Sequence, residues 1–212
     1  MNYHWNIIGH EPLLQQLEQD ISGGNLPHAY LFSGPEKVGK YIVAKKLAHI
    51  LQCERNFCHE CPTCIQIEKK THMDTIEFED DGESIKIEQI RDIITRLHMT
   101  TTGRYKIFLV ERIERMTPEA ANCLLKTLEE PPSNTIFLFT TASIKECLPT
   151  IVSRVRILSF HHCGEDLLYE KIREYYPEAD DETLNQVSRF ALGKAGIAFR
   201  LMRDPELLTL YR

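Results

Sequence analysis

Apolar residues follow two different spacings along most of the chain. Short continuous apolar runs, which are typical of buried parallel strands, occupy residues 29–33, 106–110 and 135–140. Apolar residues that recur with a helical period predict helices over residues 11–21, 40–51, 87–97 and 118–130. Strands that alternate with helices are the pattern of a doubly wound parallel sheet. We therefore predict an α/β fold, a parallel sheet flanked by helices.

The pattern changes near the last quarter of the chain. Strand-like runs stop before residue 165, and helical spacing alone continues over residues 167–175, 181–191 and 196–202. We therefore expect a core of residues 1–162 and a small helical domain of residues 163–212, with the boundary near residues 162–164.

Composition excludes several classes of protein. Of the 212 residues, 42% are hydrophobic and 26% are charged, which excludes a largely disordered chain. No apolar run approaches the ~20 residues that cross a bilayer, and residues 1–5 do not begin a secretory signal. We expect a cytoplasmic protein without a membrane contact. The formal net charge of −6 argues against coating nucleic acid by bulk electrostatics, so any DNA contact has to be local or shared with partners.

A glycine loop follows the first predicted strand and opens the next predicted helix. Residues 34–41 fit the phosphate-loop template, GxxxxGK followed by Ser or Thr, at every fixed position except the last. Gly34 and Gly39 permit the backbone angles that turn amides towards a phosphate, and Lys40 adds a cation. Tyr41 replaces the residue whose small hydroxyl ligates magnesium. We predict a degenerate loop for which ATP or ADP binding stays open and Mg²⁺ is not expected.

A second departure lies at the end of the second apolar run. In a phosphate-loop ATPase an aspartate there coordinates the metal and an adjacent glutamate activates water. Glu111 and Arg112 stand at these positions, and a guanidinium stays protonated and cannot act as a general base. A plain surface ion pair of the two residues is the alternative. Either way, we do not expect this chain to be an ATPase by itself.

Four of the seven cysteines lie within twelve residues. Cys53, Cys58, Cys61 and Cys64 supply enough thiolates for a closed tetrahedral zinc site, and their clustering favours a metal over disulfides in a reducing compartment. A site with four sulfur ligands leaves no position for substrate. We therefore expect a structural Zn²⁺ in a module of about residues 53–64, with His59 and His72 as spare ligands nearby.

Several segments together resemble bacterial clamp-loader subunits, which are AAA+ proteins. These are residues 7–10 (IIGH), 26–34 (LPHAYLFSG), the cysteine cluster, 124–132 (LLKTLEEPP) and Ser153-Arg154. The resemblance covers nearly the whole chain. In this family the gamma/tau motor carries intact Walker motifs, whereas the delta-prime subunit of DNA polymerase III often carries degraded ones. Tyr41 and Arg112 therefore favour the delta-prime type.

The resemblance implies an AAA+ module with a helical lid, set in a five-membered ring that uses ATP to open the sliding clamp and seat it on primed DNA. The partners it implies are the gamma/tau motor subunits, the delta subunit and, through the assembled ring, the sliding clamp and primed DNA. Delta-prime members also have a helical collar domain. We therefore expect these 212 residues to be the N-terminal part of such a subunit, without the collar.

Ser153-Arg154 resembles the family's Ser-Arg-Cys motif, with Val155 in place of the cysteine. In the family that arginine projects into the neighbouring subunit's nucleotide site and stabilises charge on the transferring phosphate, a task suited to a planar, permanent cation. The resemblance thus implies that Arg154 is catalytic in trans; an ordinary surface arginine is the alternative. The family also places a sensor of phosphate state where Thr140 and Thr141 stand.

These expectations combine into one favoured function and two alternatives. We expect a non-hydrolysing clamp-loader subunit, part of the DNA polymerase III holoenzyme, that completes the ring and supplies Arg154 as an arginine finger. The first alternative is an active, gamma/tau-like ATPase in which Glu111 ligates magnesium. The second is a zinc-dependent nucleic-acid binder; the acidic balance and the lack of a basic stripe with interleaved aromatic residues speak against it.

Overall fold

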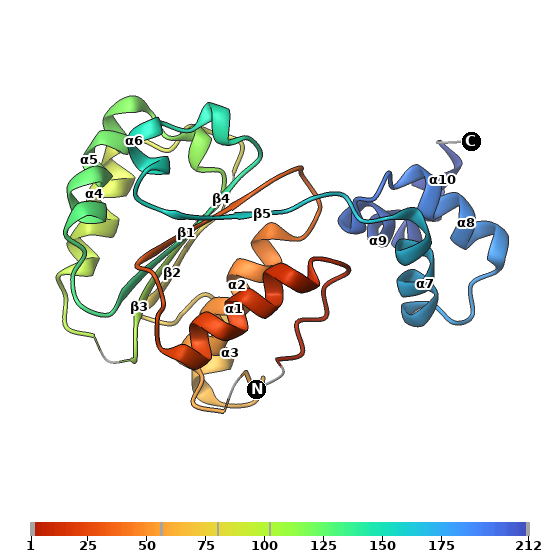
Figure 1. Ribbon diagram of the computed structural model, residues 1–212, viewed down its shortest axis with the longest axis horizontal. Helices are drawn as coiled ribbons and strands as arrows, with labels where there is room; N and C mark the ends of the chain where they lie inside the picture. Colours follow the sequence, from red (N-terminus) through yellow and green to blue (C-terminus); the bar gives the residue numbers. More distant parts are fainter. Residues whose placement is uncertain (1–2, 56, 80, 102, 211–212) are drawn as a thin grey trace.

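The computed structural model describes residues 3–55, 57–79, 81–101 and 103–210. The predicted ranges 1–162, 53–64 and 163–212 also contain Met1, Asn2, Asn56, Asp80, Thr102, Tyr211 and Arg212, which lie outside the described residues. A parallel sheet lies between two layers of helices, and a separate group of helices follows it at the C-terminal end (Figure 1).

The sheet has five strands in the order β2-β3-β4-β1-β5, and every neighbouring pair is parallel. The strands are β1 (Ala29–Ser33), β2 (Thr75–Phe78), β3 (Lys106–Val110), β4 (Thr135–Thr141) and β5 (Arg156–Ser159). The three central strands are buried along their whole length, which is why they read as continuous apolar runs. The edge strands β2 and β5 are shorter and partly exposed, and the apolar pattern does not mark them.

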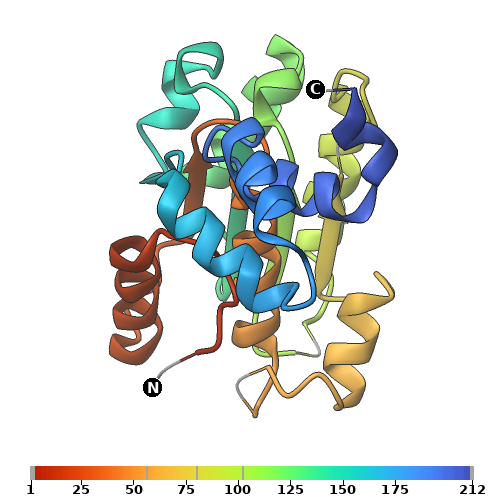
Figure 2. The ribbon, with the colours of Figure 1, turned by 90° about the vertical axis from the view of Figure 1, so that its right-hand side faces the viewer.

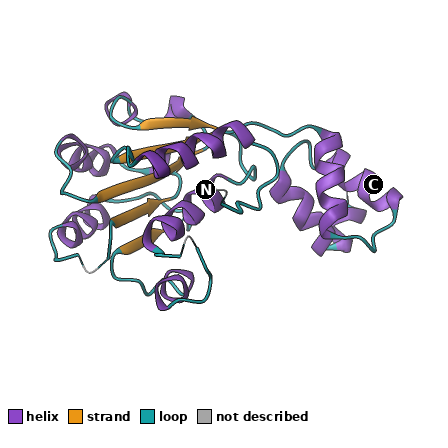
Figure 3. Cartoon of the chain, turned by 60° about the horizontal axis from the view of Figure 1, so that its bottom comes forward, coloured by secondary structure: helices purple, strands orange, loops and turns teal. Residues whose placement is uncertain are grey.

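Two layers of helices cover the sheet (Figure 3). One layer contains α1 (Glu11–Gly23) and α2 (Lys40–Gln52), beside which lies the short α3 (Pro62–Glu68). The other layer contains α4 (Ile87–Leu97), α5 (Pro118–Glu129) and α6 (Pro149–Val152). Two single 3₁₀ turns, η1 (Ile113–Arg115) and η2 (Ile144–Glu146), follow β3 and β4.

Alternate residues of the strands point into the two layers. In β1, Tyr30 and Phe32 join the core beneath α1 and α2, whereas Leu31 joins the core beneath α4 and α5. The predicted α/β fold with a flanked parallel sheet is confirmed, and the predicted helices end within three residues of the observed ones.

The C-terminal helices have a hydrophobic core of their own. They are α7 (Glu165–Tyr175), α8 (Asp181–Phe190), α9 (Ala195–Arg203) and α10 (Pro205–Thr209). Leu168, Ile172 and Leu184 are fully buried within this group, and Ile8 from the N-terminal segment packs against it. Figure 2 looks onto these helices with the sheet behind them. In the part of the chain that the structure describes, no helix has both the length and the apolar character to span a membrane.

One backbone hydrogen bond connects this group to the loop after β1. The amide of Gly196, in the first turn of α9, donates to the carbonyl oxygen of Lys37 across 2.8 Å. A Cβ atom built on Gly196 would lie 2.9 Å from that same oxygen. The close approach therefore requires glycine at this position.

Candidate functional site

A glycine loop connects β1 to α2, as the sequence predicts. Gly34 has a φ of +142°, and a Cβ atom built there would lie 2.2 Å from the carbonyl oxygen of Phe160. Gly39 has a φ of 103° immediately before α2. Both positions need glycine, Gly34 because a side chain would collide with backbone and Gly39 because of its left-handed φ. The amino-terminal end of α2 is thereby free to face a ligand, and its dipole favours negative charge there.

The ammonium of Lys40 is engaged by the loop itself. Its Nζ atom donates to the carbonyl oxygens of Gly34 at 2.6 Å and Pro35 at 2.5 Å. Burial disfavours the charged form and lowers the pKa of Lys40 to about 8, although the nearby carboxylates of Glu114 and Glu111 act in the opposite direction. Lys40, the predicted phosphate-binding cation, is thus buried, and its ammonium is hydrogen-bonded to backbone oxygens of the loop.

Tyr41 directs its hydroxyl to the edge of the sheet. The hydroxyl oxygen lies 2.9 Å from Oε2 of Glu77 in β2 and 2.9 Å from Oε1 of Glu79, so its single hydrogen is shared between these two carboxylates. Burial, together with the two carboxylates, raises the pKa of Tyr41. Lys45 stands 3.7 Å from Glu77, and Lys70 stands 2.6 Å from Glu79, so both carboxylates have a cation nearby. The phenol is therefore committed to structural hydrogen bonds.

Arg112 begins the turn after β3 and reaches back to the phosphate loop. Its φ of 53° places the backbone in the left-handed region, and its amide donates to Oγ1 of Thr140 across 3.1 Å. Its guanidinium forms an ion pair with Glu36 of the loop. The sequence suggested only a pair between neighbours, Glu111 and Arg112, and did not single out Glu36. No sequence spacing could have marked Glu36, because the pair joins two separate loops.

A single cavity brings these residues together. Its volume is about 480 Å³, and its polar side is formed by the loop from Glu36 to Tyr41, by Glu111 and Arg112, and by Thr140 and Thr141. Its other side is more apolar and comes from Asn6–Ile8 and from Ala195, Gly196 and Phe199 of α9. The cavity thus lies between the sheet and the C-terminal helices. Arg154 is absent from the described residues that line it.

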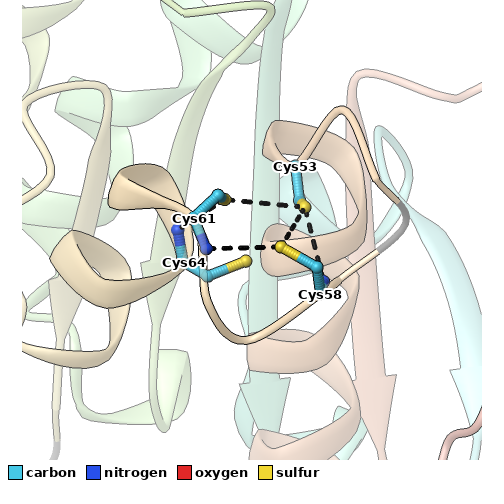
Figure 4. A group of neighbouring side chains, drawn as sticks. All are labelled: Cys53, Cys58, Cys61 and Cys64. Atoms are coloured by element: carbon cyan, nitrogen blue, oxygen red, sulfur yellow. Dashed lines mark hydrogen bonds between the residues drawn. The ribbon is translucent and has the colours of Figure 1, made fainter.

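The four clustered cysteines converge on one point (Figure 4). Their sulfur atoms all lie within 4.8 Å of one another, and Cys53 Sγ lies 3.7 Å from Cys58 Sγ and 3.8 Å from Cys61 Sγ. Four sulfurs at about 2.3 Å from a tetrahedral Zn²⁺ are about 3.8 Å apart, so these separations fit that ion. The sequence-predicted cluster is therefore assembled, with Cys53 and Cys64 buried and the other two half-buried.

Backbone amides stabilise thiolates in this cluster. The amide of Cys61 donates to Cys58 Sγ at 3.3 Å, and the amide of Cys64 donates to Cys61 Sγ at 3.4 Å. Hydrogen bonds from the amides of Glu60 and Cys61 lower the pKa of Cys58 to about 6. The ring of His59 contacts that of Phe57 in a tilted arrangement, with centroids 3.8 Å apart, and neither His59 nor His72 is part of the metal-ligand group found among the described residues.

Arg154 follows α6 and lies at the surface. Its Nη2 atom donates to Oε1 of Glu129 at 2.5 Å, and its Nη1 atom donates to the carbonyl oxygen of Thr150 at 2.8 Å. About a third of the side chain is exposed (33%), against half (50%) for Glu129. The guanidinium is therefore accessible from outside the chain, yet held in one orientation.

The fold is similar to that of two solved structures. A DNA polymerase III gamma subunit-related protein from Thermotoga maritima superposes with a TM-score of 0.57 over 89% of this chain and 70% of that one, at 23% identity. The Holliday junction branch migration motor RuvB from Thermotoga maritima superposes with a TM-score of 0.61 over 96% of this chain and 64% of that one, at 17% identity.

Residues 9–163 match the family described as DNA polymerase III, delta subunit, and the chain belongs to this family. The gamma subunit of DNA polymerase III from Buchnera aphidicola subsp. Schizaphis graminum is 30% identical over 205 residues, 92% of this chain and 56% of that protein. The tau subunit from Escherichia coli strain K12 is 37% identical over 173 residues, 79% of this chain and 26% of that protein. The chain thus spans little more than half of the first relative and about a quarter of the second.

Proposed function

We propose that the chain is a non-hydrolysing subunit of the DNA polymerase III clamp loader, of the delta-prime type. The observation that carries the proposal is the state of the phosphate-loop cavity. Lys40 donates hydrogen bonds to carbonyl oxygens of the loop, and Arg112 forms an ion pair with Glu36. The hydroxyl of Tyr41 is hydrogen-bonded to Glu77 in β2. With an arginine in place of the water-activating glutamate, and no small hydroxyl for magnesium, this cavity lacks the groups that hydrolysis needs.

The cavity retains groups that suit a phosphate without magnesium. The helix N-terminus, Lys40 and Arg112 supply positive charge on one side, and Ile7, Ile8 and Phe199 supply an apolar wall. An adenine nucleotide has both parts, an anionic phosphate chain and a flat base. We therefore propose that any ADP or ATP held here is bound without a catalytic metal.

The proposal assigns a role to each part of the chain. Residues 1–162 form the AAA+ core, and residues 163–212, which have their own hydrophobic core, form the lid. Cys53, Cys58, Cys61 and Cys64 hold a structural Zn²⁺, which their sulfur separations fit. The zinc holds the loop between α2 and α3 in place. It takes no part in a reaction, because sulfur ligands fill all four of its coordination positions.

Arg154 is the residue through which the chain acts on others. It lies outside the cavity of its own chain and is partly exposed, and a planar guanidinium suits the recognition of a phosphate. We assign it the stabilisation of phosphate charge in the site of a neighbouring gamma/tau motor subunit. In this arrangement the delta subunit, the sliding clamp and primed DNA are further partners of the assembled ring.

Turnover of an assembled loader tests this function. Arg154→Ala is expected to slow DNA- and clamp-stimulated ATP hydrolysis by at least about tenfold without loss of assembly, because an arginine finger contributes to the transition state alone. Arg189→Ala, an exposed arginine on α8, is the matched control and should leave turnover unchanged. Unchanged turnover with Arg154→Ala would remove the role.

An active ATPase of the gamma/tau type is the second candidate. The observation that favours it is the similarity, at 30–37% identity, to proteins named gamma and tau subunits. Hydrolysis by the isolated chain distinguishes the two candidates. Brisk turnover that Lys40→Ala abolishes would favour the motor, whereas turnover at the level of a buffer control supports the proposed non-hydrolysing subunit.

A further inference from the structure

The guanidinium of Arg154 is held by anchors from two different elements. Nη1 donates to the Thr150 carbonyl oxygen in α6 at 2.8 Å and to Oγ of Ser153 at 3.1 Å. Nη2 donates to the carboxylate of Glu129, the last residue of α5, at 2.5 Å. The anchors therefore fix the plane of the guanidinium and not merely the position of its charge.

The place of Glu129 is itself fixed by local sequence. Residues 118–129 form α5, and Pro131 and Pro132, which cannot continue a helix, follow after Glu130. The buried residues Leu124 and Leu128 attach the last turns of α5 to the core beside the sheet. Glu129 thus projects from a rigid helix end, whereas Arg154 is carried by the turn that follows a helix of only four residues.

The donors of Arg154 can be counted. A guanidinium has five N–H groups, of which the bonds to Thr150, Ser153 and Glu129 use three. Nε is buried and has no acceptor among the described residues. This leaves one N–H on Nη2, next to the one that Glu129 holds, for an acceptor from outside. The direction of that group depends on the bond to Glu129.

We propose that Glu129 is a positioning residue that aims Arg154 at a phosphate of the neighbouring subunit. The inference rests on the proposed role of Arg154. A long arginine side chain at the surface has many rotamers, and a donor that is already oriented loses no reorganisation energy when charge develops on a phosphate. Glu129 touches neither substrate nor reacting atoms in this scheme, and acts only through Arg154.

The test uses the assembled loader and three variants of this chain. Glu129→Ala removes the acceptor and is expected to lower kcat for ATP about tenfold, because small misplacements of a catalytic group are costly, while the KM for ATP is unchanged. Glu129→Gln keeps an oxygen that accepts from Nη2, so it should retain most of the wild-type kcat. Glu130→Ala is the matched control, since Glu130 is the next residue and is also exposed, and should behave as wild type.

A double variant separates positioning from other roles. Glu129→Ala combined with Arg154→Ala should be no slower than Arg154→Ala alone, because Glu129 has no other route to the reaction. A faster loader with Glu129→Ala would identify the carboxylate as a competitor of the phosphate and overturn the inference. Normal turnover with Glu129→Ala beside slow turnover with Arg154→Ala overturns the inference alone. Normal turnover with Arg154→Ala overturns the proposed function, and the inference with it.

Discussion

Arg112 and Glu36 form an ion pair that joins the turn after β3 to the phosphate loop. In an active ATPase the position of Arg112 belongs to a carboxylate that activates water. An arginine at this position therefore reverses the charge of one lining residue of the cavity, and Glu36 of the loop pairs with that cation. A phosphate that enters the cavity therefore has to compete with Glu36 for Arg112.

Adenine nucleotide should bind to this cavity equally well with and without magnesium. ADP titrated into the protein by calorimetry is expected to give the same Kd in magnesium-free buffer and in excess Mg²⁺, because the cations that line the cavity are the side chains of Lys37, Lys40 and Arg112. Glu36→Gln should strengthen binding about tenfold, since it removes the carboxylate that competes with phosphate for Arg112. Binding that requires magnesium, or that Glu36→Gln weakens, would contradict this interpretation.

The buried ammonium of Lys40 should make stability depend on pH in a defined window. Its pKa is lowered from 10.5 to about 8 in the folded protein. Between these values the unfolded chain binds more protons than the folded one, so the free energy of unfolding contributed by this group rises with pH. Below pH 8 the lysine is charged in both states and its contribution is constant.

Urea unfolding between pH 7 and pH 10.5 measures this effect. Relative to Lys40→Met, the wild type is expected to gain roughly 1–3 kcal/mol across the window above pH 8. Lys37→Met, at an exposed position in the same loop, is the matched control and should run parallel to wild type. A parallel course for Lys40→Met as well would mean that Lys40 titrates normally.

Lys106 is expected to contribute more to the free energy of unfolding than an exposed lysine on a strand does. It is 5% exposed, and its Nζ donates to the carbonyl oxygens of Arg96 at 2.7 Å and Leu97 at 3.3 Å, and to that of Met99. These are carbonyls of the last turn of α4 and of the turn after it, where the regular helical bonds end; the Arg96 oxygen also accepts from the Met99 amide at 3.2 Å. Lys106→Met should therefore lower the free energy of unfolding by about 2 kcal/mol in urea titrations.

The control for Lys106 is Lys145→Met, at an exposed position in η2. That change should stay within about 0.5 kcal/mol of wild type, as surface substitutions usually do. Equal effects of the two substitutions would show that the capping bonds contribute nothing measurable.

The cysteine cluster should bind about one zinc per chain and stabilise the fold. Freshly purified protein is expected to contain zinc by elemental analysis, and a strong chelator should lower Tm by at least about 5 °C. Cys61→Ser should remove the metal and give the same lowered Tm without chelator. Cys123→Ser, outside the cluster, is the control and should keep both metal and Tm. Absence of zinc from fresh protein would refute the site.

Patterns in the sequence predicted those parts of the molecule that depend on local rules. The central strands are buried on both faces and hence read as apolar runs, and the four clustered cysteines are neighbours along the chain. Strand β5 escaped prediction because it is an edge strand that contains Arg156 and Ser159. Helix α3 escaped because it has only seven residues, and Ile65 is exposed on it.

The electrostatic state of the site lay beyond sequence reasoning for a different reason. Sequence motifs identified Lys40 and Arg112 as site residues. The partner of Arg112 depends on which loops lie side by side in the folded chain. Glu36 and Arg112 lie on different strand-to-helix turns, and Glu129 and Arg154 are 25 residues apart. Pairing of this kind follows from the sheet order, which residue spacing alone does not determine.

The bond between the Gly196 amide and the Lys37 carbonyl oxygen makes the tip of the loop and the start of α9 one mechanical unit. A ligand that displaces the loop tip has to carry the C-terminal helices with it or break this bond. Since α9 shares a hydrophobic core with α7, α8 and α10, a ligand that shifts the loop tip without breaking this bond would shift all four helices.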